Sequence, residues 1–353
     1  VQHFIGHRQI KLFQSADMKE FLISEKEAGQ RMDKYLFKVL DRAPRSFVYK
    51  MLRKKNIVLN GKKAAGQEIL KPADAVRIYL ADDTFAKFAS ALPGEEKPEP
   101  SGGALTEAGH RDRAIPLKIV YEDQDILVIH KPAGMLSQKA DAGDYSANER
   151  IIDYLLESGA LTRAELRTFR PSVCNRLDRN TSGLLIAGKT VRGLQEMSVL
   201  LKSRSVKKFY RTLVSGIVES PCHLTGYLVK NHKTNQVEIT KESGGDWIET
   251  AYRPLAYFGN GTLLEVHLIT GRSHQIRAHL ASEGYPILGD GKYGDRKLSQ
   301  KLYRETGIRG QLLCACRMEF PDGKVIETEA PQEFRTAEHW LKQAAGLPKK
   351  IGT

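Results

Sequence analysis

One aspartate in this chain stands among residues that could make its carboxylate chemically useful. Asp178 lies between Arg176 and Arg179, and the turn-forming residues 180–183 then lead into four apolar residues, 184–187. A carboxylate at the entry to a core strand is rigidly aimed, and neighbouring guanidinium groups favour its charged form. The pattern indicates an ionised nucleophile or base, although an aspartate between two arginines is by itself usually a solvated turn.

The residues that follow match a nucleotide-binding pattern without its physical context. Residues 183–190, GLLIAGKT, satisfy the phosphate-loop pattern G-x-x-x-x-G-K-[ST]. That loop follows a strand and keeps its backbone N–H groups exposed to bind phosphate. Here residues 184–187 are all apolar, and the residues before Gly183 are polar. We therefore predict a buried strand that ends in a turn, and we expect no nucleotide cofactor.

The histidines and cysteines do not follow a metal-site or disulfide pattern. His267, His274 and His279 lie close together in the sequence, but the last two are five residues apart. A spacing of four is what places two imidazoles on one helical face. The four cysteines show neither zinc-site spacing nor a disulfide framework, which predicts no metal and a reducing, cytoplasmic compartment. No G-x-S-x-G elbow supports a serine hydrolase. The cysteines are Cys174, Cys222, Cys314 and Cys316.

The positive charge of the chain is unevenly distributed. The 353 residues include 55 Lys and Arg against 42 Asp and Glu, which gives a net charge of +13. Residues 22–80 hold 14 basic and six acidic residues and so contribute +8 of that excess. Such clustering on one small segment is typical of nucleic-acid binding. The longest apolar runs are only strand-sized, so we expect no membrane partner.

Within this basic segment, hydrophobic periodicity predicts two short helices and two strands. Apolar residues repeat at helical spacing over 32–40 and again over 47–52, after a break at Pro44. Residues 57–59 and 76–80 then read as strands. The segment is therefore expected to be a small α/β module.

The remaining residues predict a second, larger domain of α+β class. Residues 81–115 cluster Pro, Gly, Glu and Ser and predict a flexible linker. Residues 1–21 are expected to be an extension and 346–353 a tail. Residues 116–345 alternate predicted strands with predicted helices. This pattern favours a mixed, mostly antiparallel sheet flanked by helices. The predicted strands are 126–130, 183–188, 208–214, 248–258 and 262–269, and the predicted helices are 148–157, 191–202, 273–283 and 332–345.

Stretches along the whole chain resemble one enzyme family. In order and approximate spacing, four of them look like motifs of the RluA-type pseudouridine synthases: YEDQDILVIHKPAGM, NRLDRNTSGLLIAGKT, KKFYRTLVSG and LITGRSHQIRAHLASEGYPILGDGKYG. The stretches QRMDKYL, APRSFVYKMLRKKNIVLNGKKA and DAVRIYL resemble the RNA-binding module named after ribosomal protein S-four. The likeness covers residues 22–80 and about 118–335. It points to the subgroup that acts on large-subunit ribosomal RNA.

The resemblance implies roles for particular residues. Asp178 matches the essential aspartate of the family, Tyr210 the tyrosine that lies against the target base, and Arg277 the basic residue that pairs with the aspartate. Arg176 matches the arginine that helps to displace the flipped uridine. Further expected substrate contacts are Arg179, Lys131, His274 and Gln275, and the expected RNA contacts of the module are Arg31, Lys34, Arg45, Arg53, Lys54 and Lys55.

Two positions depart from the family pattern close to the aspartate. Asn175 stands where histidine is common, and Asn180 stands where aspartate is common. Neither has one of the three central roles, but Asn180 could alter how the turn holds Asp178.

The implied reaction needs no redox partner. Conversion of uridine to pseudouridine breaks the bond from ribose to a ring nitrogen and reattaches the base through a carbon, with no net oxidation or hydrolysis. We therefore expect no cofactor and no metal, RNA as the partner, and a monomer. Two alternatives stay open: a non-catalytic RNA-binding or ribosome-assembly protein with the same fold, and the same enzyme acting on transfer RNA.

Overall fold

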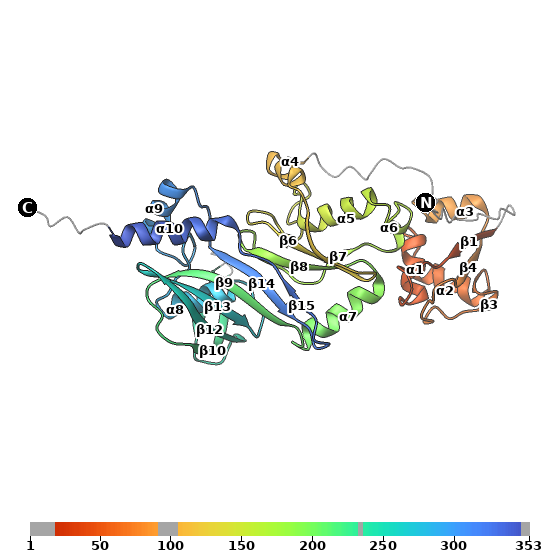
Figure 1. Ribbon diagram of the computed structural model, residues 1–353. Helices are drawn as coiled ribbons and strands as arrows, with labels where there is room; N and C mark the ends of the chain where they lie inside the picture. Colours follow the sequence, from red (N-terminus) through yellow and green to blue (C-terminus); the bar gives the residue numbers. More distant parts are fainter. Residues whose placement is uncertain (1–17, 91–104, 232–235, 347–353) are drawn as a thin grey trace, which may run out of the picture.

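The chain folds around two separate β-sheets (Figure 1). The computed structural model describes residues 18–90, 105–231 and 236–346. A four-stranded sheet lies in the N-terminal part, and an eleven-stranded mixed sheet organises the rest, each with its own apolar core. This is the expected α+β arrangement. Among the described residues, no helix is long and apolar enough to cross a membrane.

The N-terminal module contains the two predicted helices beside a short sheet. Pro44 caps the second helix at its N-terminus, a position that tolerates the missing N–H group. The strand order is β1-β4-β2-β3, and the apolar faces of both helices are buried against the sheet. The elements are β1 (Met18–Leu22), α1 (Met32–Val39), α2 (Arg45–Arg53), β2 (Ile57–Leu59), β3 (Lys62–Lys63) and β4 (Ala75–Tyr79).

Two segments outside the expected module boundary belong to its fold. Strand β1 pairs with β4, so the extension expected over 1–21 is wrong for residues 18–21. The expected linker is ordered at both ends, as α3 (Asp82–Phe88) and α4 (Glu107–Ala114). Phe85 of α3 is buried in the module core, and Phe88 packs against the same core beside Phe47. Residues 1–17, 91–104 and 347–353 lie outside the described residues.

The large sheet has the strand order β11-β10-β12-β13-β9-β14-β8-β6-β5, with β7 paired to β8 and β15 to β14. All pairs are antiparallel except β8 with β14, so the sheet is mixed, as expected. In chain order the elements are β5 (Lys118–Glu122), β6 (Ile126–Lys131), α5 (Ala147–Glu157), α6 (Glu165–Thr168), β7 (Ser172–Val173), β8 (Ser182–Gly188), α7 (Val191–Lys202), β9 (Lys207–Ser215), β10 (Cys222–Asn231), β11 (Gln236–Thr240), β12 (Asp246–Phe258), β13 (Gly261–Leu268), α8 (Gln275–Ser282), α9 (Arg296–Thr306), β14 (Leu313–Glu319), β15 (Val325–Glu327) and α10 (Gln332–Gly346).

Helices cover both faces of this sheet, and the alternation of side chains along its strands explains why. Leu127 of β6 and Leu185 of β8 face the core that α5 and α8 cover. Their neighbours Val128 and Leu184 point to the opposite face, where α7 packs. Because consecutive strand residues face opposite ways, a strand covered on both sides reads as a continuous apolar run.

Strand β8 confirms the buried-strand prediction for residues 183–188. Every residue of this strand is buried, so its amides are not exposed to bind phosphate. Lys189 pairs with Glu122 at 2.6 Å, and Thr190 caps α7 by accepting the Gly193 N–H at 2.9 Å. The stretch that matches the phosphate-loop pattern is therefore a central strand followed by an ordinary helix cap.

The other predicted elements are present, with shifted bounds. Strands β12 and β13 form the predicted hairpin, with a bulge between Pro254 and Ala256. Helix α8 begins at Gln275 instead of Ser273, because His274 takes the left-handed conformation, with φ of 57°. The edge strand β11, the inner strands β10 and β14 and helix α9 are among the elements that were not predicted.

Gly183 is required where β8 meets β14. It pairs with Ala315 and has φ of 109°, a conformation that residues with a Cβ rarely adopt. A Cβ built on Gly183 would lie 2.1 Å from the carbonyl oxygen of Ala315. The turn that carries Asp178 can therefore enter the sheet only through glycine.

We expect Gly183→Ala to lower the free energy of unfolding by about 3 kcal/mol or more, because the backbone conformation and the Ala315 carbonyl both oppose the methyl group. Gly134→Ala is the matched control: Gly134 also has positive φ, but a Cβ there meets no atom within 4 Å. Its expected cost is about 1 kcal/mol. Chemical denaturation of both variants checks this, and equal losses would contradict the steric explanation.

Candidate active site

Predicted site residues line a cleft of about 990 Å³. They come from the loop that precedes β8, from strand β9, and from the loop that leads into α8 together with the start of that helix. The predicted residues that line the cleft are Arg176, Asp178, Arg179, Tyr210, His274, Gln275 and Arg277.

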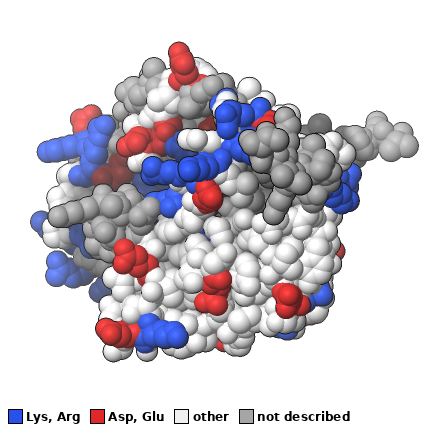
Figure 2. All heavy atoms as spheres, turned by 90° about the vertical axis from the view of Figure 1, so that its left-hand side faces the viewer, with Lys and Arg blue, Asp and Glu red and all other residues white. Residues whose placement is uncertain are grey.

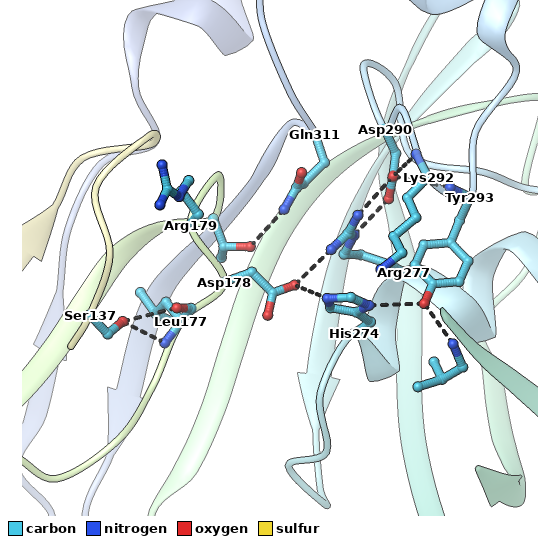
Figure 3. Close-up of polar contacts among 12 residues, drawn as sticks. Ser137, Leu177, Asp178, Arg179, His274, Arg277, Asp290, Lys292, Tyr293 and Gln311 are labelled. Atoms are coloured by element: carbon cyan, nitrogen blue, oxygen red, sulfur yellow. Dashed lines mark hydrogen bonds and ion pairs between the residues drawn. The ribbon is translucent and has the colours of Figure 1, made fainter. Parts of the chain in front are cut away.

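Asp178 lies in this cleft and is held by one strong ion pair. Its Oδ2 atom accepts a hydrogen bond from Nη1 of Arg277 at 2.9 Å and lies 3.9 Å from Nε2 of His274 (Figure 3). The side chain is 28% exposed, so it is reachable from the cleft. Its other oxygen, Oδ1, makes no hydrogen bond within the described residues and faces no competing partner there.

Arg277 is itself fixed by a second carboxylate, that of Asp290. Its Nε and Nη2 atoms donate to the two oxygens of Asp290 at 2.7 and 2.9 Å, a two-point contact. Asp290 is fully buried and also accepts the N–H groups of Lys292 and Tyr293. Burial opposes the charge of Asp290, but Arg277 and these amides together lower its pKa below the ordinary value. One guanidinium therefore bonds two carboxylates, the buried Asp290 and the partly exposed Asp178.

His274 connects the aspartate to a hydrogen-bonded chain. Its Nδ1 lies 2.9 Å from the hydroxyl of Tyr293, and that oxygen accepts the N–H of Val237 at 3.0 Å. The phenol proton is then free to bond Nδ1, which leaves the imidazole proton on Nε2, facing Asp178. Burial lowers the pKa of His274 and favours the neutral ring, despite the nearby carboxylate. The left-handed backbone of His274 is what aims the ring at Asp178.

Tyr210 forms part of the wall of the cleft from strand β9. It is 5% exposed and lies between Val266 of β13 and Ala315 of β14 in the sheet. Burial raises the pKa of its phenol, and the negative charge of Asp178 adds to this, so the hydroxyl stays protonated. The site thus combines a charged carboxylate with a protonated aromatic side chain.

Lys131, an expected substrate contact, is not among the residues that line the cleft. Its side chain is fully buried, and its ammonium donates to the carbonyls of Pro132, Met135 and Arg179 at 2.9, 2.8 and 3.0 Å. Three carbonyl acceptors use all of its donors. Lys131 therefore holds the loop around Asp178 in place.

Gln275, another expected substrate contact, lines the cleft, but its side-chain polar groups are engaged within the protein. Gln275 is 2% exposed, and its oxygen accepts from the Thr270 hydroxyl and the Arg272 amide. Its nitrogen donates to the Glu249 carbonyl and the Thr250 hydroxyl, each at 2.9 Å. With no free polar group, Gln275 fixes the start of α8 against β12.

Arg176 and Arg179 lie on the surface on either side of Asp178. Both are exposed, and neither has an ion-pair partner among the described residues. The intervening Leu177 is buried and bonded through its backbone to Ser137, at 2.9 and 3.0 Å (Figure 3). The loop is thus anchored at its centre, while its two arginines face outward.

The predicted RNA contacts of the module fall into two groups. Arg31 is bound to the buried Asp33 at 2.6 Å, and the Tyr49 hydroxyl donates to the same carboxylate at 2.8 Å. This cluster ties α1 to α2. The other five side chains are exposed: Lys34, Arg45, Arg53, Lys54 and Lys55.

Several residues that shape the site were missed by sequence reasoning. Asp290 and Tyr293 belong to the GDGKYG stretch, which carried the family resemblance but no assigned role. Gln311 donates to the Thr181 hydroxyl at 3.2 Å and braces the turn after Asp178. An acidic residue flanked by glycines was the available signal for Asp290.

Comparisons with known proteins agree with this geometry. The model of the RNA pseudouridylate synthase family matches residues 125–282. The chain is 30% identical over 337 residues to ribosomal large subunit pseudouridine synthase C of Haemophilus ducreyi, covering 93% of this chain and 95% of that protein. The chain belongs to the RluA-type pseudouridine synthase family. It is thus an isomerase that modifies RNA.

Two further similarities support the assignment of this pseudouridine synthase. Ribosomal large subunit pseudouridine synthase C of Vibrio parahaemolyticus is 30% identical over 323 residues, covering 89% of this chain and 92% of that protein. The solved structure of human RNA pseudouridylate synthase domain containing 4 has a TM-score of 0.55 and 20% identity, covering 67% of this chain and 97% of that one. At this identity the solved structure supports the fold alone.

We expect Asp290→Ala to lower the free energy of unfolding by about 3–5 kcal/mol, because it leaves the buried guanidinium of Arg277 without its two-point partner. The matched control is Asp295→Ala, which removes an exposed carboxylate that caps α9. Its expected cost is about 1 kcal/mol. Thermal and chemical denaturation measure both, and a small loss in Asp290→Ala would show that Arg277 does not depend on Asp290.

Proposed function

We propose that this enzyme converts specific uridines of large-subunit ribosomal RNA to pseudouridine, with Asp178 as its essential carboxylate. The observation that carries the proposal is the position of Asp178, which is reachable from the cleft and oriented by an arginine that a second carboxylate holds. The relatives from Vibrio and Haemophilus are named for the large ribosomal subunit, which supports the choice of RNA.

Asp178 is proposed to act as an ionised nucleophile or base beside the ribose. Arg277 orients the carboxylate by direct hydrogen bonding, and Asp290 in turn fixes the plane of the guanidinium. With Oδ2 engaged by Arg277, Oδ1 is the oxygen free to meet the nucleoside. Attack on the sugar, attack on the ring and removal of a sugar proton are all compatible with this placement.

Tyr210 is proposed to hold the detached uracil and to manage a proton. Its buried ring offers a flat apolar surface for the base, and its neutral phenol is a hydrogen-bonding group inside a partly dry site. When the base reattaches through carbon, that carbon loses a proton and the released nitrogen gains one. A protonated phenol at the cleft wall is suited to relay such a transfer.

The two exposed arginines beside Asp178 are proposed to stabilise a flipped-out uridine. A base in structured RNA must leave its stack before Asp178 can reach the sugar. The guanidinium of Arg176 has no internal ion pair among the described residues and can fill the vacated position, with Arg179 bound to the neighbouring phosphates. His274 is proposed to remain a neutral hydrogen-bond donor to Asp178 or to the substrate.

We further propose that the reaction uses no cofactor and takes place in the cytoplasm. The isomerisation involves neither net electron transfer nor hydrolysis, so a carboxylate and a shaped pocket supply the chemistry required. All four cysteines are free thiols, as is usual in a reducing compartment. We propose a monomer as the active form.

The N-terminal module is proposed to bind the RNA through α2. Arg45, Arg53 and Lys54 lie on or next to this helix with exposed side chains, and Arg45 stacks over the Phe37 ring at 5.4 Å. Exposed cations on one small module are the usual footprint of phosphate binding.

The opposite end of the molecule carries a different charge distribution. Helix α10 lies at this end, far from α2 (Figure 1). Figure 2 shows Lys and Arg along the left-hand and upper parts of this face, mixed with Asp and Glu, above a largely uncharged lower part. Exposed basic residues of α10 therefore provide controls for those of α2.

We expect Asp178→Asn to lower the rate of pseudouridine formation by about 1000-fold or more, because the amide is neither a nucleophile nor a base, while RNA affinity stays within about twofold. Asp322→Asn, in an exposed turn, is the control and should keep full activity. Tritium release from labelled RNA measures the rate, and filter binding measures affinity. Substantial activity in Asp178→Asn would overturn the proposed role.

We expect the double change Arg53→Gln and Lys54→Gln to reduce the slope of log affinity against log salt by about one to two, because phosphate contacts are lost. The control is the pair Arg335→Gln and Lys342→Gln on α10, both exposed. Titrations at several salt concentrations provide the slopes. If the two pairs changed the slope equally, α2 would not be a specific RNA contact.

A further inference from the structure

The N-terminal module rests directly on the catalytic domain. The contact is made by residues 23–30, the loop between β1 and α1, which we call the docking loop. This loop faces α6 and the first turn of α7, and α1 lies beside α6 (Figure 1). The contact is separate from both the cleft and the basic residues of α2.

The module forms hydrogen bonds with backbone groups at the ends of two catalytic-domain helices. The N–H of Val191, at the start of α7, donates to the carbonyl of Lys26 at 2.9 Å. Lys38 of α1 donates to the carbonyl of Thr168, the last residue of α6, at 2.6 Å. The first N–H and last C=O groups of helices lack partners within the helix. The docking loop and Lys38 of α1 therefore supply partners for helix-end groups of the catalytic domain.

The close approach at Gly29 extends this contact. The amide nitrogen of Gln195, one turn into α7, donates to the Gly29 carbonyl at 3.1 Å. A Cβ built on Gly29 would meet the side chains of Gln195 and Val191 at 3.6 Å, an ordinary packing distance, so α7 packs directly against this part of the docking loop.

Charged side chains on the docking loop are matched by partners across the contact. Glu27 is 5% exposed and is bonded to Ser24 within the module and to the hydroxyl of Thr168 on the catalytic domain. Lys26 pairs with Glu165 at 3.0 Å. A buried carboxylate is costly unless it is hydrogen-bonded, so these contacts favour one orientation of the module over others.

We propose that this docking fixes the distance between the basic face of α2 and Asp178, and that the enzyme thereby selects RNAs that reach both at once. The inference rests on the proposed function. A rigid two-point grip favours an RNA whose helix and target uridine have the matching separation. A loosely tethered module would strengthen RNA binding without favouring RNAs in which the helix and the target uridine have a particular separation. Docking then governs target choice while Asp178 performs the chemistry.

A reciprocal charge exchange tests the proposal in the full chain. Lys26→Glu and Glu165→Lys each place like charges together, and the combined variant restores opposite charges. Thr168→Trp is a second undocking variant, because it removes the hydroxyl bonded to Glu27 and inserts a bulky ring. Small-angle scattering of each protein shows whether the module has moved. Two RNAs are compared: a transcript of large-subunit ribosomal RNA, and a short stem-loop with the same uridine that cannot reach α2.

On the long transcript we expect each undocked variant to lose at least about tenfold in kcat/KM, with recovery in the combined exchange. On the stem-loop, the same variants should stay close to the unchanged enzyme. An expanded scattering profile with full activity on the long transcript would overturn the proposal. So would unchanged scattering in both undocking designs, because the module would then not be held by these contacts.

The controls separate this proposal from the proposed function. Asp178→Asn should abolish modification of both RNAs without changing the scattering profile. If the unchanged enzyme modifies neither RNA, the proposed substrate is wrong, and the scattering of the exchange variants still decides whether the docking contact holds.

Discussion

The buried guanidinium of Arg277 is the group on which the site depends, because it balances two carboxylates of different kinds. Asp290 is inaccessible and takes the two-point contact, which fixes the guanidinium plane. An N–H of Nη1 donates to Asp178, which is open to the cleft. If Asp178 were the only partner, the guanidinium could rotate about a single hydrogen bond. With Asp290 present, the guanidinium is held at two points and the orientation of Asp178 is fixed with it.

The precision of that contact depends on backbone anchors around Asp178. The ammonium of Lys131 donates to the carbonyl of Arg179, and the hydroxyl of Ser137 bonds both the N–H and the carbonyl of Leu177. On the far side, Gly183 lets the chain enter β8 against β14. The loop is thus fixed before, beside and after the aspartate. Exposed arginines on such a loop can move toward RNA without displacing the carboxylate between them.

Much of this could be predicted from the sequence, and the failures share a physical cause. The spacing of apolar residues located β8, the β12–β13 hairpin and the helices of the module. Burial of one or both faces of an element produces such a spacing in the local sequence. The burial of Lys131 and Gln275 could not be predicted from the sequence, because polar residues are usually exposed. Their polar groups bond to carbonyls and hydroxyls that only the folded chain brings together. Asp290 was missed for the same reason. The geometry of its loop brings it to Arg277, and the spacing of residues in the sequence does not predict that geometry.

The docking contact extends this reasoning to the whole molecule. It is built from helix ends, a buried carboxylate and an ion pair, with little apolar area among the named groups. Polar contacts of this kind add modest net stability but penalise every arrangement that leaves a buried group unpaired. They are therefore better suited to fixing an orientation than to holding two domains together. The basic residues of α2 take no part in the contact, so the module can be oriented by one surface and bind RNA with another.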